Sequence, residues 1–150
     1  DVESRGLGDV YKRQHPHSVV IGCDQVLELN GRPVGKPGNF ENAFKQLSEM
    51  SGQTVTFHSA MTVIDAKGNL QSTVVPTFIR MRNLPPEGIR EYLEREKPFN
   101  CAGSAKIEKL GIALVAECKS DDPTAIIGLP LIELTTMLAQ AGIHVLPELN

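Results

Sequence analysis

Two short motifs in this chain contain side chains that could act on phosphates. In one, Asp24 and Gln25 follow the apolar or small residues 19–23, and in the other, Lys36 stands within a Gly-Lys-Pro sequence. The apolar run favours a strand buried on both faces, which would place the Asp24 carboxylate near the end of that strand, where α/β proteins commonly bind ligands. A strand-end turn is the alternative interpretation of this pair.

The glycine-containing segment 31–37 differs from a phosphate-binding P-loop. That motif needs four residues between its glycines and Ser or Thr after its lysine. Here three residues separate Gly31 from Gly35, and Pro37 follows Lys36. Lys36 can still be a point-charge ligand of a phosphate, held by a loop that Pro37 makes rigid, or it can be a solvated surface lysine.

Three further groups of polar residues each have a functional and a structural interpretation. His15 and His17 have a spacing that can bind a metal ion, although both adjoin residues 1–14, which differ from the rest of the chain. The small residues of loop 100–108 would let a ligand approach closely, or would simply form a tight connector. The Asp-Asp-Pro sequence at residues 121–123 could bind a divalent cation, but a turn is favoured.

The composition is that of an ordinary globular protein and argues against several functions. The net charge of −3 and pI near 5.8, with no dense block of Lys or Arg, argue against a protein that coats nucleic acid. No stretch approaches the roughly 20 apolar residues of a membrane span. The three cysteines form no CxxC pair, so we predict neither a disulfide framework nor a zinc knuckle, and a reducing cytoplasm fits best.

Hydrophobic periodicity predicts the elements that would position these residues. We expect strands at residues 18–29, 53–65, 70–82 and 111–117. We expect helices between Asn39 and Gly52, between Pro85 and Lys97, and between Pro130 and Gly142. On the second strand, Thr62 belongs to the expected polar face, and in the last helix, Leu131 belongs to the expected core side. This order predicts an α/β or α+β protein with a mixed sheet.

Residues 1–14 differ from the rest of the chain. They mix acids, bases and small residues without a sustained period, so they predict neither a strand nor a helix of this domain. We interpret them as a foreign or artefactual segment that precedes one domain at residues 15–150.

Taken together, the motifs resemble the Maf family of nucleoside triphosphate pyrophosphatases. The resemblance runs from Gln14 to near the C-terminus, and it is carried by Ile21-Gly22-Cys23-Asp24-Gln25-Val26, Gly35-Lys36-Pro37, Cys101-Ala102-Gly103-Ser104, Lys106, Glu108-Lys109-Leu110-Gly111-Ile112, Asp122-Pro123 and Ile127-Gly128-Leu129-Pro130-Leu131. Glu108, with the Asp24–Gln25 pair, resembles the branch that acts on 7-methyl-GTP. The branch for dTTP and UTP typically has Thr after the aspartate and Gln in the later loop.

The resemblance implies a fold, a reaction and a set of site residues. The fold would be a mixed, twisted α/β sheet flanked by helices, related to the inosine-triphosphate pyrophosphatases, in a cytoplasmic homodimer that uses Mg²⁺ or Mn²⁺. The reaction would convert a nucleoside triphosphate and water into the monophosphate and pyrophosphate. Asp24 would be the proton acceptor and a metal ligand, Lys36 and Lys106 would contact the substrate, and Gln25 and Glu108 would select the base.

The first segment departs from the family pattern. The family begins with a strand and a loop bearing a Ser-x-Ser-x-x-Arg motif, which is not recognisable in residues 1–14, so residues 15–150 are expected to lack that part. Three alternatives stay open: a pyrophosphatase for dTTP, UTP or another nucleotide, a non-catalytic interaction protein of the septum-formation-inhibitor type, and an inactive fragment.

Overall fold

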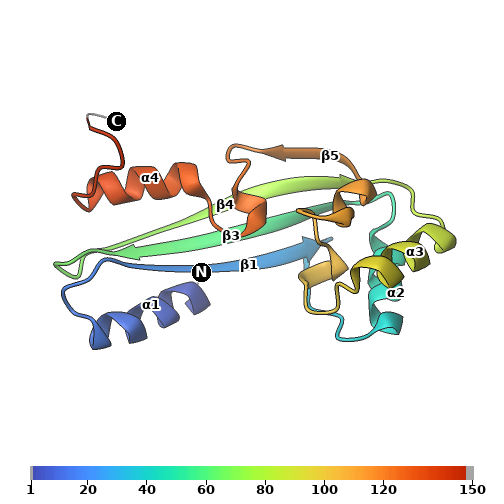
Figure 1. Ribbon diagram of the computed structural model, residues 1–150, viewed down its shortest axis with the longest axis horizontal. Coiled ribbons are helices and arrows are strands. Elements are labelled where there is room, and N and C mark those ends of the chain that lie inside the picture. The colour runs from blue at the N-terminus through green and yellow to red at the C-terminus, as the bar shows by residue number, and fades with distance from the viewer. Residues whose placement is uncertain (1, 148–150) are drawn as a thin grey trace. The chain divides into compact units, whose positions relative to one another are not determined.

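The computed structural model of the chain describes residues 2–147 (Figure 1). Its helices are α1 (Val2–Gln14), α2 (Phe40–Met50), α3 (Pro86–Glu96) and α4 (Leu131–Gln140), with short 3-10 turns η1 (Ala102–Ser104), η2 (Leu110–Leu114) and η3 (Ala125–Ile127). Its strands are β1 (Val20–Leu29), β2 (Arg32–Val34), β3 (Thr54–Ile64), β4 (Leu70–Met81) and β5 (Val115–Ser120). The predicted α/β class is therefore confirmed. None of the helices within the described residues is long and apolar enough to cross a membrane.

The chain forms two compact units that share its long strands. The first unit contains the residues up to Gln25, Ser59–Pro76 and the residues from Asp121 onward. The second unit contains Val26–His58 and Thr77–Ser120. β1, β3 and β4 each have residues in both units, so the unit to which a site residue belongs depends on its position along a strand.

The strands form one sheet in the order β2-β1-β3-β4-β5, and it is antiparallel rather than mixed. The chain passes from the first unit to the second along β1, returns along β3 and passes again along β4, so these neighbours alternate in direction (Figure 1). The physical reason is the connection between β1 and β3. Its hairpin strand β2 and its helix α2 both lie within the second unit, and no crossover carries the chain back to make a parallel pair.

The core of the first unit lies between β3 and α4. Met61, Val63, Leu134 and Met137 are buried together, and Val19, Leu129 and Leu138 pack against them. Pro130 precedes α4 and Gly142 follows it, as predicted. Leu131 is an exception to the expected core side because it is exposed in the first turn of the helix.

The core of the second unit includes the inner faces of α2 and α3. Asn39 caps α2, because its side chain accepts a hydrogen bond from the Asn42 backbone N–H at 2.8 Å. Lys97 ends α3 in the left-handed conformation. The buried side chains of the two helices are Ala43, Leu47, Met50, Ile89, Tyr92 and Leu93. Both helices agree with the predicted ranges, although Phe40 at the start of α2 is exposed.

The strand that carries Asp24 differs from its predicted form. It is not buried on both faces, because Val20 and Gly22 are buried whereas Ile21 and Cys23 are exposed. Asp24 is the fifth of the ten residues of β1 and does not lie near its end. Beyond it the exposed side changes, since Leu27 is fully buried. An apolar run alone could not predict this change, because both faces of the run carry apolar residues.

The predicted amphipathic pattern of β3 holds only for its first half. Burial alternates from Thr54 to His58, but every residue from Ser59 to Ile64 is buried, including Thr62. The Thr62 hydroxyl can be buried because it forms a hydrogen bond with the Ser72 hydroxyl at 3.2 Å. The prediction of a polar face was therefore wrong for this half of the strand.

Two other predicted segments are corrected. Residues 2–14 form a helix, α1, where neither a helix nor a strand was expected. The strand predicted at residues 111–117 begins at Val115, because η2 occupies the residues before it, and then extends to Ser120. Pro76 lies within β4, one residue before the register with β5 begins at Thr77.

Candidate functional site

Asp24 presents a half-exposed carboxylate on β1. It takes part in no hydrogen bond or ion pair with the other described residues, so both of its oxygens can accept hydrogen bonds from water or a ligand. The side chain belongs to the first unit.

The neighbouring Gln25 is held in one orientation by the first unit. Its Nε2 donates to the Ser59 hydroxyl at 3.2 Å, to the Ala125 carbonyl at 3.3 Å and to the Ile126 carbonyl at 3.0 Å. Ser59 in turn donates to the Ala125 carbonyl at 2.6 Å. Because carbonyls only accept, the nitrogen of Gln25 must face them. Only the Oε1 atom of Gln25 is left to contact a ligand, and it can only accept a hydrogen bond.

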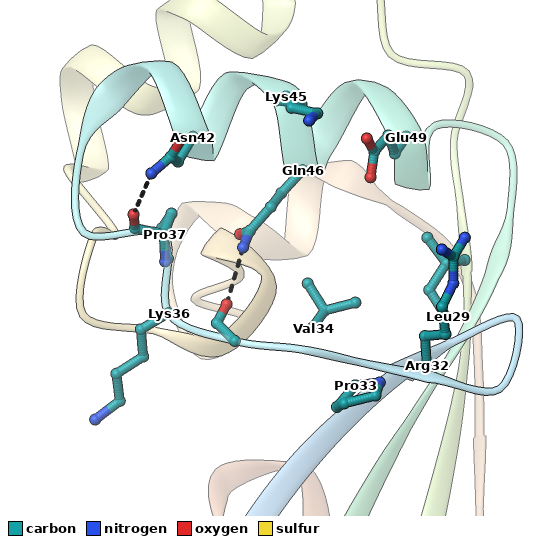
Figure 2. Close-up of a pocket in the computed structure, with 11 residues that line it drawn as sticks. Leu29, Arg32, Pro33, Val34, Lys36, Pro37, Asn42, Lys45, Gln46 and Glu49 are labelled. Carbon is teal, nitrogen blue, oxygen red and sulfur yellow. Dashed lines mark hydrogen bonds between the residues drawn. The ribbon is translucent and has the colours of Figure 1, made fainter.

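In the second unit, α2 holds the loop that carries Lys36. The Asn42 amide donates to the Pro37 carbonyl at 3.1 Å, and the Gln46 amide donates to the Gly35 carbonyl at 3.0 Å. Figure 2 shows both hydrogen bonds and shows the Lys36 side chain extending away from α2. Lys36 is exposed, as a lysine that meets a phosphate from solvent must be.

A groove of about 440 Å³ lies between this loop, the β1–β2 hairpin and α2. Its charged lining residues are Arg32, Lys36, Lys45 and Glu49. In Figure 2 the ammonium group of Lys36 lies away from the other labelled charges. Lys36 therefore belongs to the lining of the groove, and its side chain extends away from the other charged residues of that lining.

The loop that leads to Lys106 is connected to the Lys36 loop. The Gly103 backbone N–H donates to the Gly35 carbonyl at 3.1 Å, and the Ser104 hydroxyl donates to Oε1 of Gln46 at 2.9 Å. Gly103 has a positive φ of 64°, and a Cβ there would lie 2.0 Å from Leu27 Cδ2. The small residues of this loop thus permit close packing. The group that packs against the backbone of Gly103 is the core side chain of Leu27.

Tyr92 of α3 fixes the remainder of this loop. Its hydroxyl donates to the Ser104 carbonyl at 2.7 Å and accepts from the Lys106 backbone N–H at 3.0 Å. Burial raises the pKa of Tyr92 to about 12, so the hydroxyl keeps the proton that it donates. The backbone at Lys106 is therefore anchored, and its side chain is half-buried.

Glu108 is exposed two residues further along the loop. Just beyond it, Gly111 passes so close to Lys106 that a Cβ at residue 111 would lie 2.3 Å from the Lys106 carbonyl oxygen. Only glycine permits this approach, because the atom that it meets belongs to the backbone. Gly111 thus keeps the loop compact around Lys106 and Glu108.

Asp122 is a structural residue, which agrees with the favoured turn interpretation. Its Oδ1 accepts from the backbone N–H and the hydroxyl of Thr124 at 2.9 and 2.6 Å, and its Oδ2 accepts from the Ile132 N–H at 2.9 Å. Burial raises the pKa of the Asp122 carboxyl, but hydrogen bonds from Thr124, Ile132 and Glu133 outweigh it and hold the pKa below its usual range. Asp122 therefore caps the start of α4.

The described residues contain no group of three or more His, Cys, Asp or Glu side chains that could hold a metal ion. His15 stacks on Tyr11, with 4.3 Å between the ring centroids, and His17 is exposed. Asp24 offers one carboxylate. One protein carboxylate fits Mg²⁺ only in a site where substrate phosphates and water supply the other ligands.

The predicted site residues divide between the two units. Asp24 and Gln25 belong to the first unit, and Lys36, Lys106 and Glu108 belong to the second. Sequence reasoning missed several polar residues that hold them, which are Asn42, Gln46, Ser59 and Tyr92, and it named Ser104 only as part of a loop motif. Spacing offered one signal: Asn42 and Gln46 are four residues apart on α2 and share a face of the helix.

The fold and the exposed, anchored Lys36 loop define an α/β protein with a polar site on loops beside its sheet. Comparison with known families is consistent with this description. Residues 5–141 match the family described as Maf-like protein, and the chain belongs to this family. The match includes residues 5–14, so it overlaps the segment that we interpret as foreign, and that interpretation stays a prediction.

Several curated relatives are named 7-methyl-GTP pyrophosphatase. The protein from Thiobacillus denitrificans is 50% identical over 133 residues, which cover 88% of this chain and 66% of the relative. The protein from Cupriavidus pinatubonensis is 52% identical over 131 residues, covering 87% and 66%, and that from Bordetella pertussis is 54% identical over 129 residues, covering 86% and 64%. The chain thus spans slightly less than two thirds of the length of these relatives.

Proposed function

We propose that this protein is a nucleoside triphosphate pyrophosphatase that hydrolyses 7-methyl-GTP to 7-methyl-GMP and pyrophosphate. The observation that carries the proposal is that about half of the aligned residues are identical to those of relatives named for this activity. The anchored Lys36 loop supports it, because a triphosphate needs a cation held in a defined position.

In this mechanism the lysines and the aspartate have different tasks. Lys36 and Lys106 neutralise charge on the triphosphate, which otherwise repels a nucleophile. Asp24 accepts a hydrogen bond from the attacking water and takes its proton as the bond to phosphorus forms. A divalent cation, when bound by Asp24 and the phosphates, would supply further charge neutralisation. Pyrophosphate leaves when the bond between the α-phosphorus and its bridging oxygen breaks.

For base selection we assign an acceptor role to both polar residues. Glu108 offers two oxygens to the adjacent N–H donors of guanine, and its negative charge suits the cationic methylated ring. Gln25 presents Oε1, since its nitrogen is bonded to Ser59 and to backbone carbonyls. The use of Mg²⁺ or Mn²⁺, a homodimeric assembly and a cytoplasmic location stay predictions from the family resemblance.

The decisive experiment measures pyrophosphate release from 7-methyl-GTP, GTP, dTTP and UTP in the presence of Mg²⁺. We expect the highest kcat/KM with 7-methyl-GTP. Asp24→Asn should lower kcat by about 100-fold or more while KM changes by less than about threefold, because the amide cannot accept the proton of water. Asp121→Asn, the same change at an exposed aspartate of the same unit, is the matched control. Full turnover by Asp24→Asn, or no release from any nucleotide by the unmodified protein, would contradict the proposal.

A further inference from the structure

The Lys36 loop is bound by two amide side chains that lie one helical turn apart on α2. Asn42 and Gln46 donate to the carbonyls of Pro37 and Gly35, at 3.1 and 3.0 Å. These are the residues on either side of Lys36, so the backbone of the lysine is held at both ends. Four residues of spacing put both amides on one face of the helix.

We propose that Asn42 and Gln46 are positioning residues for Lys36, and that Gln46 also couples the Lys36 loop to the loop of Lys106. With the flanking carbonyls turned toward α2, the Lys36 side chain extends away from the helix (Figure 2). The amides therefore set the direction in which the ammonium is presented. This inference rests on the proposed function for its chemical consequence, and it adds residues to which no role in the reaction has yet been given.

Gln46 is bonded at both ends of its amide. Its nitrogen donates to the Gly35 carbonyl, and its oxygen accepts from the Ser104 hydroxyl at 2.9 Å. The Gly103 backbone N–H donates to the same Gly35 carbonyl at 3.1 Å. A lysine at residue 46 would lack the acceptor, and a glutamate would lack the donor, so only an amide satisfies both loops.

The position of the Lys36 ammonium should affect the reaction, because charge neutralisation depends on where the cation is held. A misplacement of about 1 Å can cost about 100-fold in rate, even when the reacting groups themselves are unchanged. Lys36 is exposed, and its ammonium has no hydrogen bond or ion pair with the other described residues, so no polar contact of its own fixes it. Its position must come from the loop, and the loop takes its position from α2 and Ser104.

The test is a double-mutant cycle between Gln46→Glu and Lys36→Ala. Gln46→Glu keeps the acceptor for Ser104 and turns a carboxylate oxygen toward the Gly35 carbonyl, which should displace the loop. We expect this change to raise the Kd for inorganic triphosphate, and KM for 7-methyl-GTP, by about tenfold in the natural background. In the Lys36→Ala background it should change both by less than about twofold, because Lys36 is gone and the variant keeps the acceptor for Ser104 of the Lys106 loop.

A role in stability alone gives a different result. In that case Gln46→Glu would change Kd and KM by the same factor whether or not Lys36 is present, and this outcome would overturn the inference. Asn42→Asp provides a second variant at an exposed residue, with the same expectation. Gln53→Glu is the matched control, since Gln53 is exposed and, within the described part of the chain, only its backbone forms hydrogen bonds.

Hydrogen exchange makes the test independent of folding failure and of turnover. The Gly103 amide should exchange about tenfold faster in Gln46→Glu than in the natural protein or in Gln53→Glu, because its acceptor moves. If the cycle behaves as expected but no nucleotide is hydrolysed, only the proposed function fails. If nucleotides are hydrolysed but the cycle is additive, only this inference fails. Absence of both triphosphate binding and turnover would overturn both.

Discussion

At the scale of single residues, the most informative side chain is Gln25, because the structure limits what it can do. Its nitrogen is committed to Ser59 and to two backbone carbonyls of the Ala125 turn. A free glutamine could donate and accept, whereas this one can only accept from a ligand. The sequence motif identifies Gln25 as a candidate, but the direction of its amide depends on residues 34 and 100 positions away.

Glu108 provides a test of base selection at the same scale. Glu108→Gln replaces one acceptor oxygen with a donor and removes the negative charge, while the size of the side chain hardly changes. We expect the preference for 7-methyl-GTP over dTTP, as a ratio of kcat/KM values, to fall by about tenfold or more. Glu117→Gln, at another exposed glutamate of the second unit, is the control. A Glu108→Gln variant with an unchanged ratio would remove Glu108 from the recognition of the base.

Gly111 provides a test of loop packing. Gly111→Ala would place Cβ 2.3 Å from the Lys106 carbonyl oxygen, so the backbone must move. We expect the free energy of unfolding to fall by about 2 kcal/mol or more. The matched change is Gly88→Ala in α3, where the new Cβ would meet only Pro85, at 3.4 Å. This change should raise the free energy of unfolding by about 0.5–1 kcal/mol. Urea denaturation checks both, and equal effects of the two alanines would refute the close-approach argument.

At the scale of elements, the start of α4 is capped by residues that lie outside the helix. Pro130 precedes the helix and has no side-chain cap, and the donors are satisfied instead from the preceding turn. Asp122 accepts from the Ile132 N–H, and the Thr124 hydroxyl accepts from the Leu131 N–H at 2.8 Å. The start of α4 thus depends on a buried carboxylate ten positions upstream of the Ile132 N–H that donates to it.

Asp122→Ala tests this cap and its pH dependence. At pH 7 we expect the free energy of unfolding to fall by about 1–3 kcal/mol, because helix donors lose their acceptor. The pKa of Asp122 is lower in the folded state than in the unfolded state, so its contribution is complete above the unfolded value of about 3.9 and is lost as pH falls below it, through the folded pKa.

The difference in unfolding free energy between the natural protein and Asp122→Ala should therefore narrow below about pH 3.9, as measured by urea denaturation at several pH values. Asp121→Ala, at the exposed neighbour, should cost less than about 0.5 kcal/mol at pH 7. If Asp122→Ala lowers the free energy of unfolding as much well below about pH 3.9 as it does at pH 7, the carboxylate is not the capping group.

At the scale of the whole molecule, the described chain consists of two units joined by strands that run through both. Asp24 and Gln25 stand at the last positions of β1 that belong to the first unit, whereas Lys36, Lys106 and Glu108 all belong to the second. The predicted site residues therefore divide at a boundary that lies within β1. The unit boundary within β1, directly after Gln25, was not visible in the sequence.

Local patterns explain why some elements were predicted well. The ranges of α2 and α3 were predicted because their apolar spacing, the Asn39 cap and the prolines at the start of α3 act within one or two turns of helix. β1 and β3 were predicted as strands, but their burial was not. Burial of a strand depends on what packs on each face, as the buried hydroxyls of Ser59 and Thr62 demonstrate.

The sequence by itself determined the family, the α/β class and the identity of the candidate side chains, because these reside in local residue order and in motif spacing. Only the tertiary structure decided how those side chains are presented. The fixed amide of Gln25, the attachment of the Lys36 loop to Asn42 and Gln46, and the capping role of Asp122 all depend on hydrogen bonds between parts of the chain brought together by folding. A buried or half-buried polar group must find a partner wherever the fold supplies one, and sequence spacing alone does not predict that partner.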